Sequence, residues 1–157
     1  MVVDFAGLDS YPRLLGDLSR IWGWRGYSPF AFALALGFGE AHARECVIAL
    51  SVLLLGLIAV NGFRRSDGDW RAFVLAVALS LVASPIVWTH YLVILMIPIA
   101  VSRPRLSPLW FLPIAFWPMP VRSDGALWLI AATTALTTVI LLGSVVSSSA
   151  PHPVAAI

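Results

Sequence analysis

The stretch from Ala126 to Val146 has the sequence ALWLIAATTALTTVILLGSVV and contains no Asp, Glu, Lys or Arg. An α-helix rises about 1.5 Å per residue, so roughly 20 apolar residues cross a bilayer core about 30 Å thick. Residues 46–63 and 72–102 are also free of these charged residue types. Together the uncharged stretches predict a helical protein embedded in a membrane.

The composition excludes an ordinary soluble domain. Of the 157 residues, 60% are hydrophobic and only 11% are charged, and the mean hydropathy is +0.91. A soluble domain is usually about a quarter charged. All ten basic residues are arginines scattered among loops, and without a basic stripe that carries aromatic residues we expect no nucleic-acid partner. Cys46 is the single cysteine, so no disulfide can form within the chain.

We therefore expect an all-α fold, a polytopic transmembrane bundle of about four or five spans with an interfacial amphipathic helix before it. The stretch 28–39 holds only twelve residues, so it is either interfacial, re-entrant or a short span. Several prolines punctuate residues 104–120, which predicts a short or broken helix over 109–117. The remaining expected helices cover 46–62, 67–83, 86–101 and 126–146.

A helical hairpin is predicted over residues 67–101. Without a break this stretch would form a helix of about 50 Å, too long for one span. Pro85 clashes with a continuing helix and restricts Ser84 to an extended backbone, so the tip falls at Ser84–Pro85. The spacing of Ser66 and Asp69 is that of a capping box at the start of the first arm. Pro98 is a kink that a membrane helix tolerates.

Residues 8–22 predict an amphipathic helix, with Ser10 as its cap and Pro12 in its first turn. Its apolar residues recur at helical spacing opposite Arg13 and Asp17. The helix lies either along the membrane surface or as a polar helix packed on the bundle. We expect three regions: an extracytoplasmic or interfacial segment over 1–27, a transmembrane region over 28–146, and a disordered tail over 147–157.

Arginine placement predicts the orientation of the chain. Arginines gather in the loop 61–71, as Arg64, Arg65 and Arg71, and in the loop 102–108, as Arg103 and Arg105. The positive-inside rule puts both loops in the cytoplasm. The hairpin tip around Ser84–Tyr91, and the loop with Arg122, then lie outside. The expected location is the plasma membrane, with several passes.

His90 is the ionisable side chain that stands near a predicted span and away from the arginine loops. Ionisable groups at membrane depth are costly and are often functional, and imidazole exchanges protons near neutral pH. In the alternative interpretation Trp88, His90 and Tyr91 only anchor the helix end at the interface. The sequence has no phosphate loop, metal-ligand spacing or nucleophile elbow, so we expect no metal and no cofactor.

The run Ser84-Pro85-Ile86-Val87-Trp88-Thr89-His90-Tyr91, with the proline-containing apolar helix after it, resembles a signature of the GT-C glycosyltransferases of family eighty-seven. That family includes actinobacterial mannosyl- and arabinofuranosyltransferases, and its pattern is approximately Ser-Pro-x-Ser-Trp-x-His-His. Ser84, Pro85, Trp88 and His90 match it, whereas Val87 and Tyr91 depart from it. The order of the surrounding segments over residues 8–102 is also similar.

The resemblance implies transfer of a hexose or pentose from a polyprenyl-phosphate donor to a glycolipid or polysaccharide acceptor of the cell envelope. It implies that His90 is catalytic, beside the donor phosphate or the acceptor. Ser84, Trp88 and Tyr91 are then expected to bind substrate, with the Trp88 ring against the sugar or the prenyl chain. Membrane lipids, the lipid-linked sugar donor and the acceptor are the implied partners.

The resemblance also implies that a part is missing. GT-C enzymes usually carry an acidic general base in a first outer loop, ahead of the region matched here. The chain is therefore expected to be the C-terminal portion of such an enzyme, inactive alone, with an N-terminal portion as a further partner. Two other interpretations stay open. One is a non-catalytic membrane subunit, and the other is a transporter fragment whose broken helix at Ser84–Pro85 lines a pathway.

Overall fold

The computed structural model describes residues 10–64, 68–103 and 105–147, which form helices and connecting segments without a strand. The helices in chain order are α1 (Tyr11–Trp22), the 3-10 helix η1 (Gly23–Arg25), α2 (Pro29–Ala35), α3 (Glu40–Arg64), α4 (Gly68–Ala83), the 3-10 helix η2 (Thr89–Leu95), α5 (Met96–Ser102), the 3-10 helix η3 (Pro108–Phe116) and α6 (Leu127–Ser147). The all-α prediction is confirmed.

Two of the described helices are long and apolar enough to cross a membrane, namely Glu40–Gly62 within α3 and Leu127–Val146 within α6. This number is smaller than the four or five expected. The difference arises because α4 has 16 residues and because prolines and 3-10 turns divide the segments between α4 and α6.

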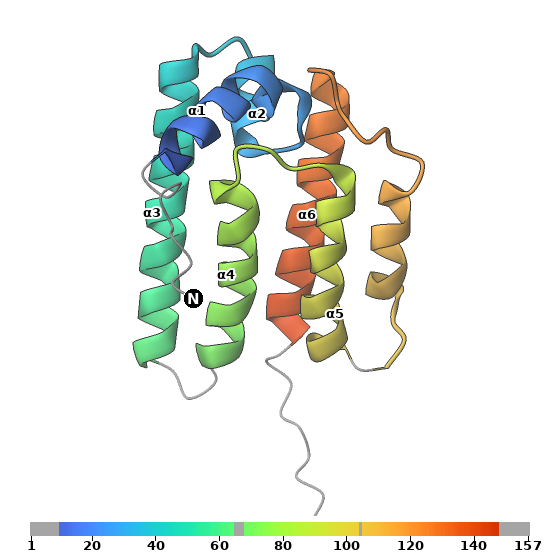
Figure 1. Ribbon diagram of the computed structural model, residues 1–157. Helices are drawn as coiled ribbons and strands as arrows, with labels where there is room; N and C mark the ends of the chain where they lie inside the picture. The colour runs from blue at the N-terminus through green and yellow to red at the C-terminus, as the bar shows by residue number, and fades with distance from the viewer. Residues whose placement is uncertain (1–9, 65–67, 104, 148–157) are drawn as a thin grey trace, which may run out of the picture.

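The long helices stand side by side, and α1 and α2 lie across one end of them (Figure 1). The turn between α4 and η2 is at this same end, which we call the motif end. The opposite end, where α3 finishes, α4 starts and α5 finishes, is called the arginine end because Arg71 and Arg103 lie there. The two loops predicted to share one side of the hairpin therefore lie at one end of the bundle.

The predicted break at Ser84–Pro85 is confirmed, since α4 ends at Ala83 and η2 begins only at Thr89. The second arm thus starts three residues later than expected, because residues 84–88 are irregular. It begins as 3-10 helix and becomes the α-helix α5, which contains Pro98. Of the proposed capping pair, Ser66 lies outside the described residues, whereas Asp69 lies in the first turn of α4.

Helix α1 forms where predicted, with Pro12 in its first turn. Ser10 occupies the N-cap position, but its backbone is helical and its side chain makes no capping hydrogen bond, so that part of the prediction is wrong. Helix α2 is only seven residues long, about 10 Å. It is too short to cross a bilayer, and it packs into the motif end with Phe30 and Ala31 buried.

Helix α3 differs from its prediction at its start. The helix was expected to begin at residue 46 and instead begins at Glu40, so that the polar residues 40–45 form its first turns. There Glu40 and Arg44 make an exposed ion pair of 3.6 Å at helical spacing. Because an acidic residue in the first turn favours helix formation, these residues extend the helix rather than interrupt it. The predicted tail over 147–157 falls outside the described residues apart from Ser147.

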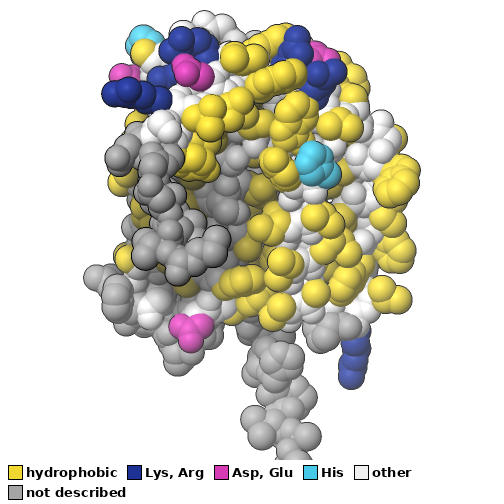
Figure 2. All heavy atoms as spheres, viewed as in Figure 1, with side chains coloured by type: hydrophobic (Ala, Val, Ile, Leu, Met, Phe, Trp, Pro, Cys, Tyr) yellow, Lys and Arg dark blue, Asp and Glu magenta, His cyan; other side chains and the backbone are white. Residues whose placement is uncertain are grey.

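The main core lies between η2, α5, η3 and α6, where Leu95, Ile99 and Ile140 are completely buried. Helix α3 contributes little to any core, since only 6% of its most apolar window is buried, against 28% for α6. Most of its valines, leucines and isoleucines are exposed, whereas Val47, Leu54 and Ile58 are half-buried. On the face shown in Figure 2, hydrophobic side chains cover the region between the two ends and charged side chains gather at the ends.

Candidate functional site

The candidate site centres on residues 84–91, called here the motif segment. Its first half leaves helical conformation at Pro85, as proline requires. The Ser84 hydroxyl donates a 2.8 Å hydrogen bond to the carbonyl oxygen of Ile86. This short-range bond closes a turn of the kind that Ser favours, so Ser84 shapes the backbone of the motif segment.

The loop between α1 and α2 holds the motif segment in place. The Tyr27 backbone N–H donates to the Val87 carbonyl over 2.7 Å, and the Ser28 hydroxyl donates to the Pro85 carbonyl over 3.0 Å. Ser28 also caps α2 by accepting a hydrogen bond from the Ala31 N–H at 3.2 Å. One buried hydroxyl therefore starts a helix and anchors the motif segment.

Gly26 allows this close approach. A Cβ at this position would lie 3.0 Å from the Val87 carbonyl oxygen and 3.2 Å from its nitrogen. Both neighbours are backbone atoms and cannot turn away as a side chain would. The absence of a side chain at residue 26 therefore lets the two loops pack against each other.

A third loop, between η3 and α6, completes the motif end. The Tyr27 hydroxyl donates to the Pro120 carbonyl over 2.7 Å, and the Ser123 hydroxyl donates to the Gly26 carbonyl over 2.8 Å. The Ser123 N–H donates to the Arg25 carbonyl, also over 2.8 Å. Residues 23–28 thus bond to both neighbouring loops, and three segments distant in sequence form one platform.

Ser84, His90 and Tyr91 line a single pocket of about 340 Å³ beside the motif segment. The rings of His90 and Tyr91 meet edge to face with 4.5 Å between their centroids. Both side chains are exposed. Three of the four predicted site residues are thus brought together, and the imidazole is accessible from outside the chain.

Trp88 does not line this pocket. Its ring lies 6.2 Å from the Trp22 ring, at an angle of 47°, and is half-buried. Aromatic pairs at this separation stabilise the elements that carry them, so Trp88 joins the motif segment to the end of α1. Substrate binding by Trp88 stays a prediction.

Arg25 carries the main charge of the platform. Its guanidinium lies 5.2 Å from the centroid of the Trp22 ring and 4.7 Å from that of Trp24. Its Nε atom is 3.6 Å from a carboxylate oxygen of Asp124. An arginine over indole rings is stabilised by cation–π attraction, and this ion pair leaves the cluster without net charge.

Burial raises the pKa of the Tyr27 phenol, and the negative charge of Asp124 raises it further. Tyr27 stays neutral at physiological pH and keeps its proton for the Pro120 bond. Among the described residues, no group of three or more His, Cys, Asp or Glu side chains could hold a metal ion.

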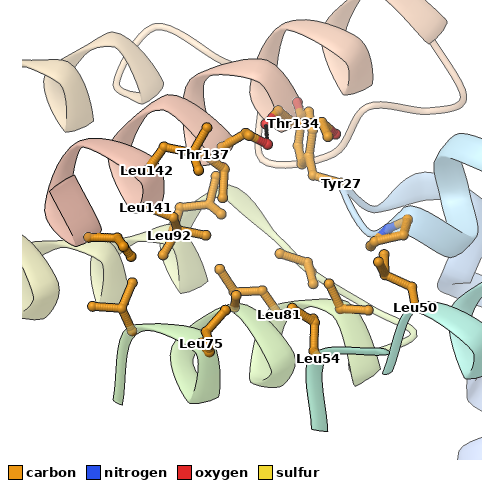
Figure 3. A pocket seen from close by; sticks show the side chains of 17 residues that line it. Tyr27, Leu50, Leu54, Leu75, Leu81, Leu92, Thr134, Thr137, Leu141 and Leu142 are labelled. Atoms are coloured by element: carbon orange, nitrogen blue, oxygen red, sulfur yellow. Dashed lines mark hydrogen bonds between the residues drawn. The ribbon is translucent and has the colours of Figure 1, made fainter. Parts of the chain in front are cut away.

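An apolar groove of about 350 Å³ lies behind the platform, between α3, α4 and α6 (Figure 3). Tyr27 and Val87 border it at the motif end, and Leu81 and Val87 line both this groove and the pocket of His90. Leucine side chains from α3, α4 and α6 point into it. The groove and the His90 pocket are therefore separated by a wall to which both Leu81 and Val87 contribute.

Sequence reasoning missed Gly26, Tyr27, Ser28 and Ser123. Their bonds join segments that are 57 to 97 residues apart, so no local spacing identifies them. The nearest signal is the pair of glycines, Gly23 and Gly26, in the short stretch between two helical patterns, which predicts a loop but not its partner.

Comparison with protein-family models, with curated proteins and with solved structures found no match to the chain.

Proposed function

We propose that the chain is a multi-pass protein of the plasma membrane, with its motif end at the extracytoplasmic surface. Support comes from α3, which exposes nearly all of a window apolar enough to span. Burying that window in lipid removes a cost that water would impose. Helix α4 packs against α3, while η2 and α5 pack against α6. Helix α4, and η2 together with α5, are each about 24 Å long. With modest thinning of the bilayer they cross it as well.

The function best supported is that of a glycosyltransferase portion, which helps move a hexose or pentose from a polyprenyl-phosphate donor to a cell-envelope glycolipid or polysaccharide. The observation that carries it is the pocket shared by Ser84, His90 and Tyr91, three positions of the run that resembles family eighty-seven. This pocket lies at the end opposite the arginine loops, where the donor headgroup is expected.

The chemistry requires that the bond between the sugar carbon and the phosphate oxygen breaks while the acceptor oxygen bonds to that carbon. The acceptor hydroxyl loses a proton, and the polyprenyl phosphate leaves with an added negative charge. An imidazole at His90 serves either need, by accepting the proton or, as imidazolium, by stabilising the phosphate. The edge of the Tyr91 ring would orient that imidazole.

Transfer assays on the native protein that contains this chain test the proposal. Membranes are supplied with labelled polyprenyl-phosphate mannose or arabinofuranose, and label entering glycolipid or polysaccharide is counted. His90→Ala is expected to lower transfer by about 100-fold or more, the usual contribution of a general acid or base. His42→Ala is the matched control and should leave transfer unchanged, because His42 is an exposed histidine at the start of α3 and does not line this pocket. Undiminished transfer by His90→Ala would contradict the proposal.

A non-catalytic membrane subunit is the second candidate. One observation favours it. The residues that line the His90 pocket include no Asp or Glu, whereas GT-C glycosyltransferases usually employ an acidic base. In that case the platform would hold a partner protein, and neither His90→Ala nor His42→Ala would alter transfer by the complex.

A further inference from the structure

The groove between α3, α4 and α6 offers an aliphatic surface to whatever fills it. Leu54, Leu75 and Leu141 are among its lining residues. Two of its four polar side chains bond within the chain, since the Thr138 hydroxyl donates to the Thr134 carbonyl over 2.8 Å and the Tyr27 hydroxyl donates to the Pro120 carbonyl. A polar ligand would find few partners here, so the occupant is apolar.

Hydrogen bonds join the walls of the groove near each of its ends, and its side is open. At the motif end, the Tyr27 N–H donates to the Val87 carbonyl. At the arginine end, the Trp70 indole N–H donates to the Ser144 carbonyl over 3.3 Å and joins α4 to α6. Leu50 on α3 and Leu142 on α6 line the groove and are exposed. Entry is therefore lateral, from the surface that the membrane would cover.

The length of the groove suits an extended hydrocarbon chain. It follows α6 from Thr134 to Val145, about 17 Å along the axis. Along that length the aliphatic walls keep apolar groups out of water and offer them dispersion contacts.

The position of Arg71 indicates at which end of the groove a charged lipid headgroup would lie. Val74, Leu75 and Ala78 share one face of α4, called here the α4 stripe, and line the groove. Arg71 continues this stripe one turn towards the arginine end, since residues three and four apart share a helix face. Its side chain is half-buried. Trp70 beside it is a residue type typical of the headgroup level.

We propose that the groove binds one acyl chain of an anionic phospholipid from the leaflet at the arginine end, with its phosphate at Arg71. This inference rests on the membrane placement proposed above and not on glycosyl transfer. The lipid would fill the space between the α3–α4 hairpin and α6 and would pack against the platform at the motif end. It would take no part in the reaction at His90.

Photocrosslinking tests the site. The chain is reconstituted into vesicles that contain a phosphatidylglycerol or a phosphatidylcholine with a photoreactive group midway along one acyl chain, and labelled peptides are mapped by mass spectrometry. We expect label concentrated on residues 74–82 and 134–145, with phosphatidylglycerol preferred. Ala78→Trp, which fills the groove, should abolish this label. Ala49→Trp is the matched control, because Ala49 is exposed on α3 outside the groove.

Arg71→Gln adds no bulk to the groove, so it tests the same site even if Ala78→Trp does not fold. It should reduce the preference for phosphatidylglycerol about fivefold, the effect of one arginine near a charged membrane surface. Label spread evenly over the exposed face of α3 would overturn the proposal, as would crosslinks between two copies in the groove. A polyprenyl-phosphate probe that displaces the phospholipid would overturn it too. His90→Ala should leave all labelling unchanged, so failure here is distinct from failure of the transfer proposal.

Discussion

The motif end and the middle of the bundle are held together by different forces. At the motif end, hydrogen bonds from Tyr27, Ser28 and Ser123 join loops that are far apart in sequence. In the middle, the described hydroxyls of Ser80 and Thr138 bond within their own helices. The helices meet there through aliphatic side chains.

This difference fits a chain whose middle meets lipid and whose end meets water and substrate. Apolar packing tolerates exchange of one aliphatic residue for another, whereas a hydrogen bond to a buried carbonyl depends on one donor. The motif end should therefore be sensitive to small changes, and the middle should be sensitive only to charge or to altered volume.

The largest effect is expected from Leu53→Asp in the middle of α3, where Leu53 is 57% exposed. If this surface faces lipid, a carboxylate there costs about 3 kcal/mol, and the fraction of chain inserted into membranes should fall sharply. Ala41→Asp, in the charged first turn of the same helix, is the control and should insert normally. Equal insertion of the two variants would show that α3 does not face lipid.

Gly26→Ala should be the most damaging small change at the motif end. Its Cβ would lie 3.0 Å from the Val87 carbonyl oxygen, and forcing the loops apart should lower the free energy of unfolding by about 2 kcal/mol. Unfolding is followed in detergent by circular dichroism. Gly56→Ala on α3, where a Cβ meets nothing within 4 Å, should be neutral or stabilising. Similar losses for both would refute the close packing described here.

Ser28→Ala removes both the cap of α2 and the bond to Pro85. We expect a loss of about 1.5 kcal/mol in the free energy of unfolding, with faster hydrogen exchange at Val87 and its neighbours. Ser80→Ala serves as control, because the Ser80 hydroxyl bonds only to the Val77 carbonyl of its own helix. Unchanged exchange in Ser28→Ala would mean that Ser28 does not anchor the motif segment.

Tyr27→Phe should cost about 1 kcal/mol through the lost bond to Pro120 and should alter the response to alkali. Burial raises the pKa of the folded-state phenol, while the unfolded phenol titrates near pH 10. Between those two values only the unfolded state loses its proton, so the stability contributed by this difference falls as the pH rises. The variant should show a smaller alkaline loss, and an identical pH profile would contradict the assignment.

Asp124→Asn should have the smallest effect, below about 0.5 kcal/mol. Both partners of its ion pair with Arg25 are partly exposed, at 33% and 59%, and such pairs contribute little in water. Thermal unfolding at low and high salt would measure it. A large, salt-dependent loss would show that charge, rather than hydrogen bonding, holds the motif end together.

The sequence predicted most of the helices because hydropathy and proline placement act locally. Such local rules predicted three features: the break at Ser84–Pro85, the long helix α6 and the short helix that begins at Pro108. The predicted start of α3 was wrong. Glu40 and Arg44 are polar, but they pair at helical spacing and so extend the helix by its first turns.

The candidate site was predictable only in part. His90, Ser84 and Tyr91 adjoin one another along the chain, so a local motif located all three and the structure places them in one pocket. The platform that holds them depends on Tyr27 and Ser123, whose partners are about 90 or more residues away. Hydrophobic periodicity carries no information on such pairings.

Cysteine accessibility tests most directly the central claim, that a membrane lies between the motif end and the arginine end. In a Cys46→Ser background, Arg122→Cys and Arg105→Cys are expressed separately, and intact cells are treated with a maleimide that cannot cross membranes. We predict labelling of residue 122 at the motif end and protection of residue 105 until the cells are broken. Equal labelling of both positions in intact cells would contradict the account.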